Sequence, residues 1–500
     1  MKTRTMKRRN LMVLGTSSDA GKSVLAAGLC RIAKRRGLSV APFKSQNMSN
    51  NAAVTAAGHE IGRAQALQAV AAGIEPDSRM NPILLKPEGE RRSQIVLEGR
   101  AFARADFREY DQYRARCVDA IDRSLASLRE EYDVLVCEGA GSPVEINLME
   151  RDIANLFVAR RADAEIVLVG DIDRGGIFAS FVGTLALLPD EDRERLGGLV
   201  VNRFRGDVTL LEPGLVDLAE RTGTPVLGVV PYLDDLGLPE EDGQSIVVRN
   251  ASRPDDAGRF QVAVVRLPRL ANQDDLVPFE REEEIAVRYV DRAEGLEGVD
   301  LVVLPGSKNT RADLAWLRTS GLAEAITRRA EAGGRVHGIC GGYQMLGRSV
   351  ADPSGFEGEA GSTDGLDLLP VATVFEKAKT VRRIEVVRGP GAPPWMSGLS
   401  EAWRASGYEI HAGAVRLDDG TRPIFERVGD GARSGGDGAA SGSVTGTLVH
   451  GLFADRSILR EFVGRPLAAP TQRDPIDAAL DRLADVLEGS LDPAALARWF

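Results

Sequence analysis

The sequence predicts an α/β protein with two domains, each built on a parallel β-sheet. Three observations support this prediction: runs of Val, Ile and Leu at strand length, stretches of helical spacing between them, and glycine-rich turns directly after several strands. Apolar runs that alternate with helices are typical of a parallel sheet covered on both faces. A length of 500 residues exceeds one ordinary core and suggests about two to four domains.

Composition narrows the class of protein. A hydrophobic content of 43% with 27% charged residues indicates a soluble globular chain, which we expect to be cytoplasmic; the sequence leaves open whether it is a monomer or a homo-oligomer. The net charge of -10 argues against nucleic acid or anionic membrane surfaces as partners, because their phosphates would be repelled. The four cysteines form no CxxC pair, so reduced thiols are the simplest interpretation. No run is long and apolar enough to span a membrane.

The first domain is predicted to cover residues 1–235. LMVL at 11–14 is a buried strand, the glycine loop follows, and a helix ends at Gly37. Further strands are expected at 39–44, 133–141, 164–173, 196–204 and 224–232.

A polar, charged linker is expected at 236–259, and a second domain at 260–465 opens with the strand RFQVAVVRL. Within this domain, GGRVHGICGGYQMLG has the form of a strand, a tight turn and a helix. The glycine- and serine-rich stretch 428–443 is expected to be a flexible surface loop, and residues 466–500 an amphipathic helical tail.

The loop GTSSDAGKS at 15–23 is predicted to bind nucleotide phosphates. A P-loop needs inward-facing N–H groups, a helix N-terminus, a lysine on the terminal phosphates and a hydroxyl on Mg²⁺. Gly21, Lys22 and Ser23 supply the last elements, although the leading glycine is Gly15 where the usual spacing would place it at Thr16. The candidate ATP-binding residues are Thr16, Asp19, Gly21, Lys22, Ser23 and Lys44.

Other polar residues follow the predicted strands, where ligands of open α/β sheets bind. Glu138 ends one strand and is expected, with Ser23, to hold Mg²⁺ directly or through water. Asp171 and Asp173 are placed equally well for a site or for a solvated turn. Lys44 could contact a phosphate or a carboxylate, or could be a surface lysine.

The turn GICGG points to a second, different chemistry. Glycines around Cys340 permit a strained elbow that raises the sulfur, and the following helix would lower the pKa of the thiol. The N–H of Gly341 would face an oxyanion, and the loop PGS, with Gly306, could give a second donor. Cys30, Cys117 and Cys137 are interpreted as buried structural cysteines.

A cysteine nucleophile needs a base, and the chain has four histidines. His59 lies in the first domain, and His337 lies on the strand that leads to the thiol, where packing is its expected role. His411 and His450 both follow strands of the second domain, so the residues alone leave both open.

The motifs together resemble a known family. The P-loop variant resembles that of dethiobiotin synthetase, whose relatives phosphorylate a carboxylate and read adenine with an asparagine that Asn202 resembles. GTLVHGLF resembles the catalytic-histidine motif of class I glutamine amidotransferases, which selects His450. With PFKSQNMSNN, EIGRAQALQA, MNPILLKP, VCEGAGSPVEINL and GDIDRGGIFAS, the chain resembles the cobyric acid synthase family.

This resemblance implies a dethiobiotin-synthetase-like nucleotide domain and a flavodoxin-like amidotransferase domain. It also implies that glutamine and ATP are used to amidate the b, d, e and g carboxylates of a corrinoid, adenosylcobyrinic acid a,c-diamide. The position two residues after His450 is Leu452, where most class I enzymes have an orienting glutamate. This absence resembles the branch that acts on cobyrinic acid derivatives, whose members use a Cys–His pair alone, and it leaves open what fixes the imidazole tautomer. The segment 268–282 also departs from the family pattern.

Three alternatives remain open from the sequence. A cobyrinic acid a,c-diamide synthase shares both chemistries, although PFKSQNMS and MNPILLKP favour the cobyric acid branch. An amidotransferase of a cell-wall lipid precursor pairs its glutaminase with a separate ligase chain. A ParA-like ATPase switch would explain the P-loop but needs no nucleophilic cysteine.

Overall fold

The computed structural model describes residues 10–88, 92–106, 108–233, 236–238, 258–429, 432–468 and 474–500. The predicted linker lies mostly outside these residues. In the described part of the chain, no helix combines the length and hydrophobicity that a bilayer-spanning helix needs.

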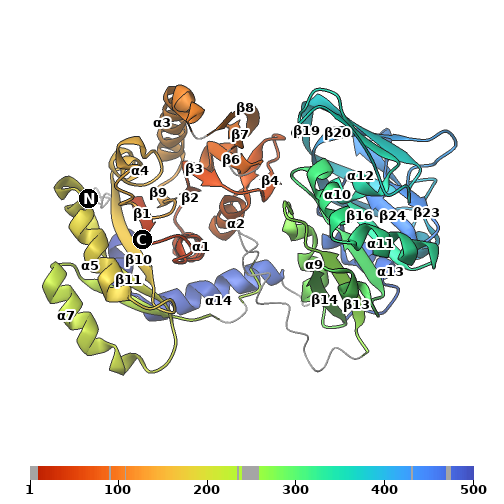
Figure 1. The fold of residues 1–500 in the computed structure, drawn as a ribbon. Coiled ribbons are helices and arrows are strands. Elements are labelled where there is room, and N and C mark those ends of the chain that lie inside the picture. The colour runs from red at the N-terminus through yellow and green to blue at the C-terminus, as the bar shows by residue number, and fades with distance from the viewer. Residues whose placement is uncertain are drawn as a thin grey trace.

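The first domain is built on a six-stranded sheet in the order β12-β11-β10-β1-β9-β2 (Figure 1). All its strand pairs are parallel. The strands are β1 (Asn10–Gly15), β2 (Val40–Phe43), β9 (Val134–Glu138), β10 (Ala164–Asp171), β11 (Leu196–Phe204) and β12 (Val226–Pro231). The prediction of a parallel sheet is therefore confirmed.

Helices cover both faces of this sheet, as its two-sided apolar strands require. One hydrophobic core joins the sheet to α1 (Lys22–Arg35), and the core on the other face contains side chains of α3 (Arg114–Glu131), α4 (Leu156–Arg161), α5 (Ile177–Leu187) and α7 (Glu212–Thr222). The helix α2 (Arg63–Ala72) packs on α1. A single-turn helix, α6 (Asp190–Arg193), precedes β11.

A smaller sheet extends the first domain toward the second (Figure 1). Its order is β3-β6-β7-β8, and a two-stranded ribbon, β4-β5, lies nearby. The bounds are β3 (Gln46–Met48), β4 (Ala52–Val54), β5 (Glu60–Gly62), β6 (Ile83–Pro87), β7 (Arg92–Leu97) and β8 (Arg100–Asp106).

The second domain has its own six-stranded sheet, in the order β14-β13-β15-β16-β24-β23. Only the edge pair β23–β24 is antiparallel. The strands are β13 (Phe260–Val265), β14 (Ile285–Val290), β15 (Leu301–Leu304), β16 (Arg335–Ile339), β23 (Ala439–Ser441) and β24 (Val444–Thr447). The helices are α9 (Val277–Arg281), α10 (Thr310–Thr319), α11 (Leu322–Glu331), α12 (Gly341–Leu346) and α13 (Arg456–Val463).

Another sheet of the second domain packs beside α12, in the order β18-β17-β19-β21-β22 with β20 paired to β19. Its strands are β17 (Ser349–Asp352), β18 (Gly361–Asp364), β19 (Val371–Arg388), β20 (Arg404–Leu417), β21 (Phe425–Gly429) and β22 (Ala432–Asp437). The expectation of a flexible loop at 428–443 is wrong, because β22 and β23 lie within that stretch. Backbone pairing to β21 and β24 overrides the weak strand preference of glycine and serine.

The C-terminal segment returns to the first domain (Figure 1). Its helices α14 (Pro475–Ser490) and α15 (Pro493–Trp499) join the same core as α1. A Cβ on Gly28 of α1 would lie 2.2 Å from Leu487, which shows how closely α14 approaches. Trp499 is fully buried, and its indole N–H donates to Glu165 at 2.9 Å.

Candidate active sites

Cys340 lies on a sharp turn between β16 and α12. Its φ of 51° and ψ of −108° are values that a residue with a side chain rarely adopts. The turn is held because the Cys340 N–H donates to Thr447 O at 2.8 Å and its carbonyl accepts from Gln344 N–H at 3.0 Å. This strand, strained turn and helix form the arrangement by which a nucleophile is raised above a sheet.

The two predicted oxyanion donors lie on segments that flank Cys340. Gly341 is the first residue of α12, so its N–H has no partner within the helix. A Cβ on Gly341 would lie 2.8 Å from Ser307 N, which shows how closely the 305–307 loop approaches the elbow. Gly306 of this loop faces His450, because a Cβ there would lie 3.5 Å from the imidazole Cε1.

His450 is fully buried just after β24, and a carboxylate holds its ring. Its Nδ1 lies 2.6 Å from Oδ2 of Asp275, while Asp275 Oδ1 accepts the Gly451 N–H at 2.6 Å. Asp275 ends a short 3-10 helix, η6 (Gln273–Asp275). Because the ionised carboxylate can only accept, it fixes the tautomer with hydrogen on Nδ1 and leaves Nε2 for Cys340.

The charges around His450 favour a protonated ring. Burial lowers the pKa of His450, but the carboxylate of Asp275 and the hydrogen-bonded sulfur of Cys340 outweigh burial and raise the pKa well above its usual value. The ring of Tyr408 stacks on the imidazole, with centroids 5.1 Å apart and planes inclined by 16°. The imidazole can therefore hold a proton beside the sulfur of Cys340.

Asp275 answers a question that the sequence leaves open, namely which residue orients the imidazole of His450. Leu452, at the position where a glutamate was sought, is buried and supplies no carboxylate. The orienting carboxylate comes instead from the segment 268–282, which lies 175 residues before the histidine in sequence. Sequence spacing gives no signal for such a distant pair.

The other three histidines contact residues that take no part in the Cys340–His450 pair. His59 bonds Ser78 in the first domain, and His411 lies 2.9 Å from the carbonyl of Gly413. His337 is buried against Phe453 and Phe462, and burial lowers its pKa to about 3.

The other three cysteines are buried, as expected for structural residues. Burial raises the pKa of the Cys30 and Cys117 thiols, and it raises that of Cys137 to about 12. None of them is set up as a thiolate near neutral pH.

The predicted phosphate loop joins β1 to α1. Gly21 has a φ of 96°, and a Cβ there would lie 2.0 Å from the Asn202 amide nitrogen, so both conformation and space require glycine. Lys22 is the first residue of α1, and its Nζ donates to the carbonyls of Ser17 at 2.8 Å and Gly141 at 3.0 Å. A strand, a glycine loop and a helix N-terminus with lysine form an anion-binding arrangement.

Glu138 collects three donors beside this loop. Its carboxylate accepts from Ser23 Oγ at 2.7 Å, Lys44 Nζ at 2.7 Å and Gln68 Nε2 at 2.6 Å. Burial raises the pKa of Glu138, but these three partners, Lys44 foremost, lower it below its usual value. Lys44 is therefore a buried counter-ion of Glu138 and not a surface lysine. Gln68 was missed from the sequence, although it lies in the EIGRAQALQA motif.

The donors around Ser23 suit Mg²⁺ in a nucleotide site. Within the described ranges, no three His, Cys, Asp or Glu side chains gather as a metal cage. Magnesium bound with nucleotide needs only one or two protein oxygens, because phosphates and water complete its shell. The Ser23 hydroxyl and the ionised Glu138 carboxylate are hard oxygen donors of this kind.

The other predicted nucleotide residues divide into two groups. Asp19 and Asn202 line the cleft beside the loop, and Asn202 Nδ2 donates to Ala20 O at 2.9 Å. Thr16 donates its N–H to Val169 O at 2.9 Å, so this N–H is not available to a phosphate. We therefore leave Thr16 out of the phosphate-binding set.

Asp171 and Asp173 have structural partners. They bond Arg203 at 2.8 Å and Arg205 at 3.2 Å, and Asp171 also caps the turn by accepting the Asp173 N–H. The turn interpretation therefore accounts for both.

A cleft of about 2460 Å³ runs between the domains. Lys22, Ser23 and Glu138 line it on one side, while Gln273 and Asp274, next to the orienting Asp275, line it on the other. Its volume exceeds the roughly 300–1,000 Å³ of ordinary small-molecule pockets. One large ligand could therefore contact the phosphate loop and the segment that holds His450.

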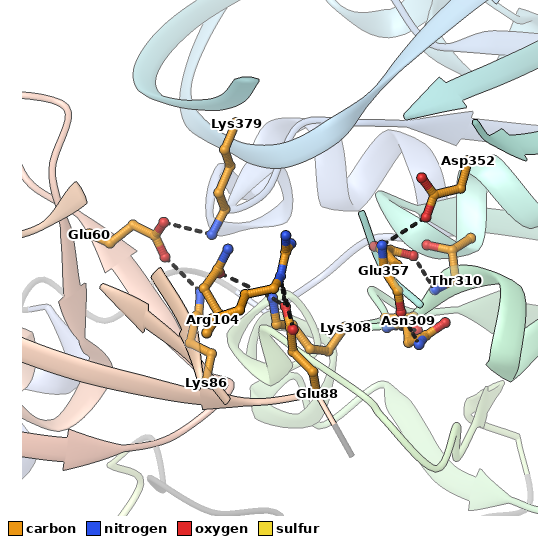
Figure 2. Close-up of polar contacts among 12 residues, drawn as sticks. Glu60, Lys86, Glu88, Arg104, Lys308, Asn309, Thr310, Asp352, Glu357 and Lys379 are labelled. Atoms are coloured by element: carbon orange, nitrogen blue, oxygen red, sulfur yellow. Dashed lines mark hydrogen bonds and ion pairs between the residues drawn. The ribbon is translucent and has the colours of Figure 1, made fainter. Parts of the chain in front are cut away.

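Buried ion pairs join the two domains beside this cleft (Figure 2). Glu60, from β5, accepts from Lys379 of β19 at 2.6 Å and from Lys86 of β6 at 2.7 Å. Burial raises the pKa of Glu60, but these two ammonium groups lower it to about 2, whereas burial lowers the pKa of Lys379 to about 7. Both pKa values fall for compatible reasons. Two amines stabilise the anion of Glu60, whereas Lys379 is buried and shares its one carboxylate with Lys86. Lys308, next to the oxyanion loop, adds a pair to Glu88 at 3.4 Å.

Known proteins match nearly the whole chain. A CobQ/CobB/MinD/ParA nucleotide binding domain matches residues 11–246, and a CobB/CobQ-like glutamine amidotransferase domain matches residues 261–458. A protein named cobyric acid synthase in Sorangium cellulosum is 49% identical, covering 99% of this chain and 99% of its own length. Proteins of the same name in Chloroflexus aurantiacus and Herpetosiphon aurantiacus are 48% and 44% identical, each covering 98% of this chain and 98% and 97% of their own.

Proposed function

The chain belongs to the cobyric acid synthase family, and from this premise we propose that it amidates the b, d, e and g carboxylates of adenosylcobyrinic acid a,c-diamide. It is a glutamine-dependent amidating enzyme of cobalamin biosynthesis with a nucleotide-binding domain. The roles of individual residues, the metal and the choice of substrate carboxylates belong to this proposal.

The glutaminase half uses Cys340, His450 and Asp275. The Cys340 sulfur attacks the side-chain carbonyl of glutamine, and His450 takes the thiol proton and then gives it to the departing ammonia. Asp275 keeps the ring in the required tautomer, and the N–H groups of Gly306 and Gly341 stabilise the oxyanion. Water activated by His450 then cleaves the thioester and releases glutamate.

The ligase half activates a carboxylate that is itself a poor electrophile. Lys22 and the N–H groups of the loop hold the phosphates of ATP while a substrate carboxylate attacks the γ-phosphorus and ADP departs. Ser23 and Glu138 would hold Mg²⁺, which supplies neutralisation of phosphate charge when bound. Ammonia attacks the carbonyl of the acyl phosphate, inorganic phosphate leaves, and a carboxamide remains.

The observation that carries this proposal is the position of the cleft. One continuous cavity contacts both the phosphate loop and the segment beside the catalytic histidine. A large substrate with carboxylates around its rim fits such a cavity, because different carboxylates can be presented to one phosphate loop in turn.

The test is mass spectrometry of the corrinoid after incubation with ATP and either glutamine or ammonium. The native enzyme should exchange four carboxylates for carboxamides with either nitrogen source, each with the same mass step. Cys340→Ala should lose the glutamine reaction and keep the ammonium reaction. If Cys340→Ala still used glutamine, or if the native enzyme left the corrinoid mass unchanged, the proposal would be refuted.

A further inference from the structure

We propose that Arg63, in the nucleotide-binding domain, positions the Cys340–His450 pair of the other domain through Asp274. The inference rests on the proposed function in one respect only, namely that this pair hydrolyses glutamine. It assigns Arg63 as a positioning residue and not as a group that touches the reacting atoms.

The contact between Arg63 and Asp274 crosses the domain boundary. Arg63 is the first residue of α2, and its guanidinium lies 2.6 Å from Asp274 Oδ2. The Asp274 side chain is only 7% exposed, and the same oxygen accepts from Tyr408 OH at 3.0 Å. Burial raises the pKa of Asp274, and Arg63 is the strongest influence that opposes this rise.

Asp274 adjoins the residues that hold the catalytic ring. Asp275, the next residue, is bonded to His450 Nδ1, and Asn272 lies 3.3 Å from Nε2 of the same ring. Asn272 has a φ of 56°, in the left-handed region that asparagine adopts more readily than most residues, and it occupies the N-cap position of the short helix that ends at Asp275. A shift of this short helix therefore changes both contacts of the imidazole at once.

Tyr408 gives Asp274 a second route to the same ring. It stacks on His450, and the two residues exchange backbone N–H to carbonyl bonds of 2.9 and 3.0 Å. Arg63 therefore contacts Asp274 Oδ2, the same oxygen that accepts from the hydroxyl of Tyr408.

The helix that carries Arg63 also contacts the nucleotide site. Gln68, five residues later, donates to Glu138 Oε2 at 2.6 Å and to Ser23 O at 3.3 Å. Five residues of α-helix span only about 7.5 Å. One rigid helix therefore joins the proposed metal ligands to the glutaminase, so that glutamine hydrolysis depends on how the nucleotide domain is docked.

The pH behaviour of the pair gives a test that simple destabilisation would not mimic. The charged and titratable groups that face it are Asp275 and Asp274 on the loop, Arg63 on α2, Tyr408 on β20 and the two members Cys340 and His450. Asp274→Asn removes a negative charge and leaves the arginine. It should move the acid limb of glutaminase kcat/KM to lower pH, by roughly half a unit. Adding Arg63→Met in that background removes the remaining cation and should return the limb toward its native position.

The rate test compares glutamine-driven with ammonium-driven amidation in each full-length variant, so that loss of folded protein cancels from the ratio. Arg63→Met should lower this ratio at least tenfold, and Arg63→Lys, which keeps the charge, should recover at least half of it. The matched control is Arg383→Met, which breaks another contact between the domains, because the Arg383 side chain bonds Val54 O and Glu75; the backbone of Arg383 pairs with Tyr408 on β20, and the substitution leaves that pairing in place. This control should keep the native ratio.

The inference is overturned if Arg63→Met keeps the same ratio as Arg383→Met, if Arg63→Lys recovers nothing, or if the acid limb is the same in Asp274→Asn and in the double variant. Failure of the proposed function would be seen separately, as glutamine hydrolysis that survives Cys340→Ala.

Discussion

Asp275→Asn tests the geometry of the glutaminase at a single hydrogen bond. In the native chain both carboxylate oxygens accept, one from His450 Nδ1 and the other from the Gly451 N–H, each at 2.6 Å. An asparagine can satisfy Gly451 only with its oxygen, which turns its NH₂ group toward Nδ1. The imidazole must then accept at Nδ1 and carry hydrogen on Nε2, so it cannot take the proton of the thiol.

The expected loss follows from this wrong tautomer. The same exchange in a serine triad lowers kcat by about 10⁴-fold. A thiol ionises more readily than a hydroxyl, so we expect a fall of about 100- to 10,000-fold, or roughly 2.7 to 5.4 kcal/mol of transition-state stabilisation.

The assay measures glutamate release and corrinoid amidation separately. Glutamate release should fall by the stated factor, while amidation from ammonium should persist because the phosphate loop is untouched. The matched control is Asp485→Asn, the same chemical change at a side chain that is 63% exposed on α14. A glutaminase rate within tenfold of native in Asp275→Asn would refute the reasoning.

Three further predictions test other parts of the molecule. Lys22→Met should stop amidation from both glutamine and ammonium while glutamate release continues, because only the phosphate loop is changed; corrinoid product from ammonium would contradict this. Gly342→Ala should lower glutaminase activity at least 100-fold without changing ATP binding, because a Cβ at this position would lie 2.0 Å from Leu304 O. A native rate in this variant would show that the turn at Cys340 tolerates the extra methyl group. Glu60→Gln should lower the free energy of unfolding at pH 7 by about 3 kcal/mol in urea titrations, because the buried amines of Lys86 and Lys379 lose the carboxylate that they share. Since the pKa of Glu60 is lowered to about 2, its contribution is complete above its ordinary value of 4.5 and lost as the pH falls toward 2, so native and Glu60→Gln stabilities should converge in that window.

Much of the fold could be predicted from the sequence because the signals are local. Buried strands such as β1 and β10 are short apolar runs, and the elbow at Cys340 and the loop at Gly21 carry glycines that their backbones require. Residues whose role depends only on such a turn, such as Cys340 and Gly21, could therefore be predicted from the sequence.

The parts that could not be predicted depend on contacts between distant segments. Asp275 and Gln68 act through partners far away in sequence, and no periodic pattern marks either one. The strands β22 and β23 were mistaken for a loop, because their glycines and serines carry little intrinsic preference and pairing alone orders them. Thr16 was included by position in the loop, but its N–H is used by the sheet.

The return of α14 and α15 to the first domain has a consequence for biosynthesis of the chain. Leu483, Leu487 and Trp499 belong to the same buried cluster as the side chains of β1 and α1. On a ribosome, the nucleotide-binding half therefore stays without part of its interior until the entire glutaminase has been translated. The cell consequently obtains the half that consumes ATP in finished form only when its own source of nitrogen already exists on the same polypeptide.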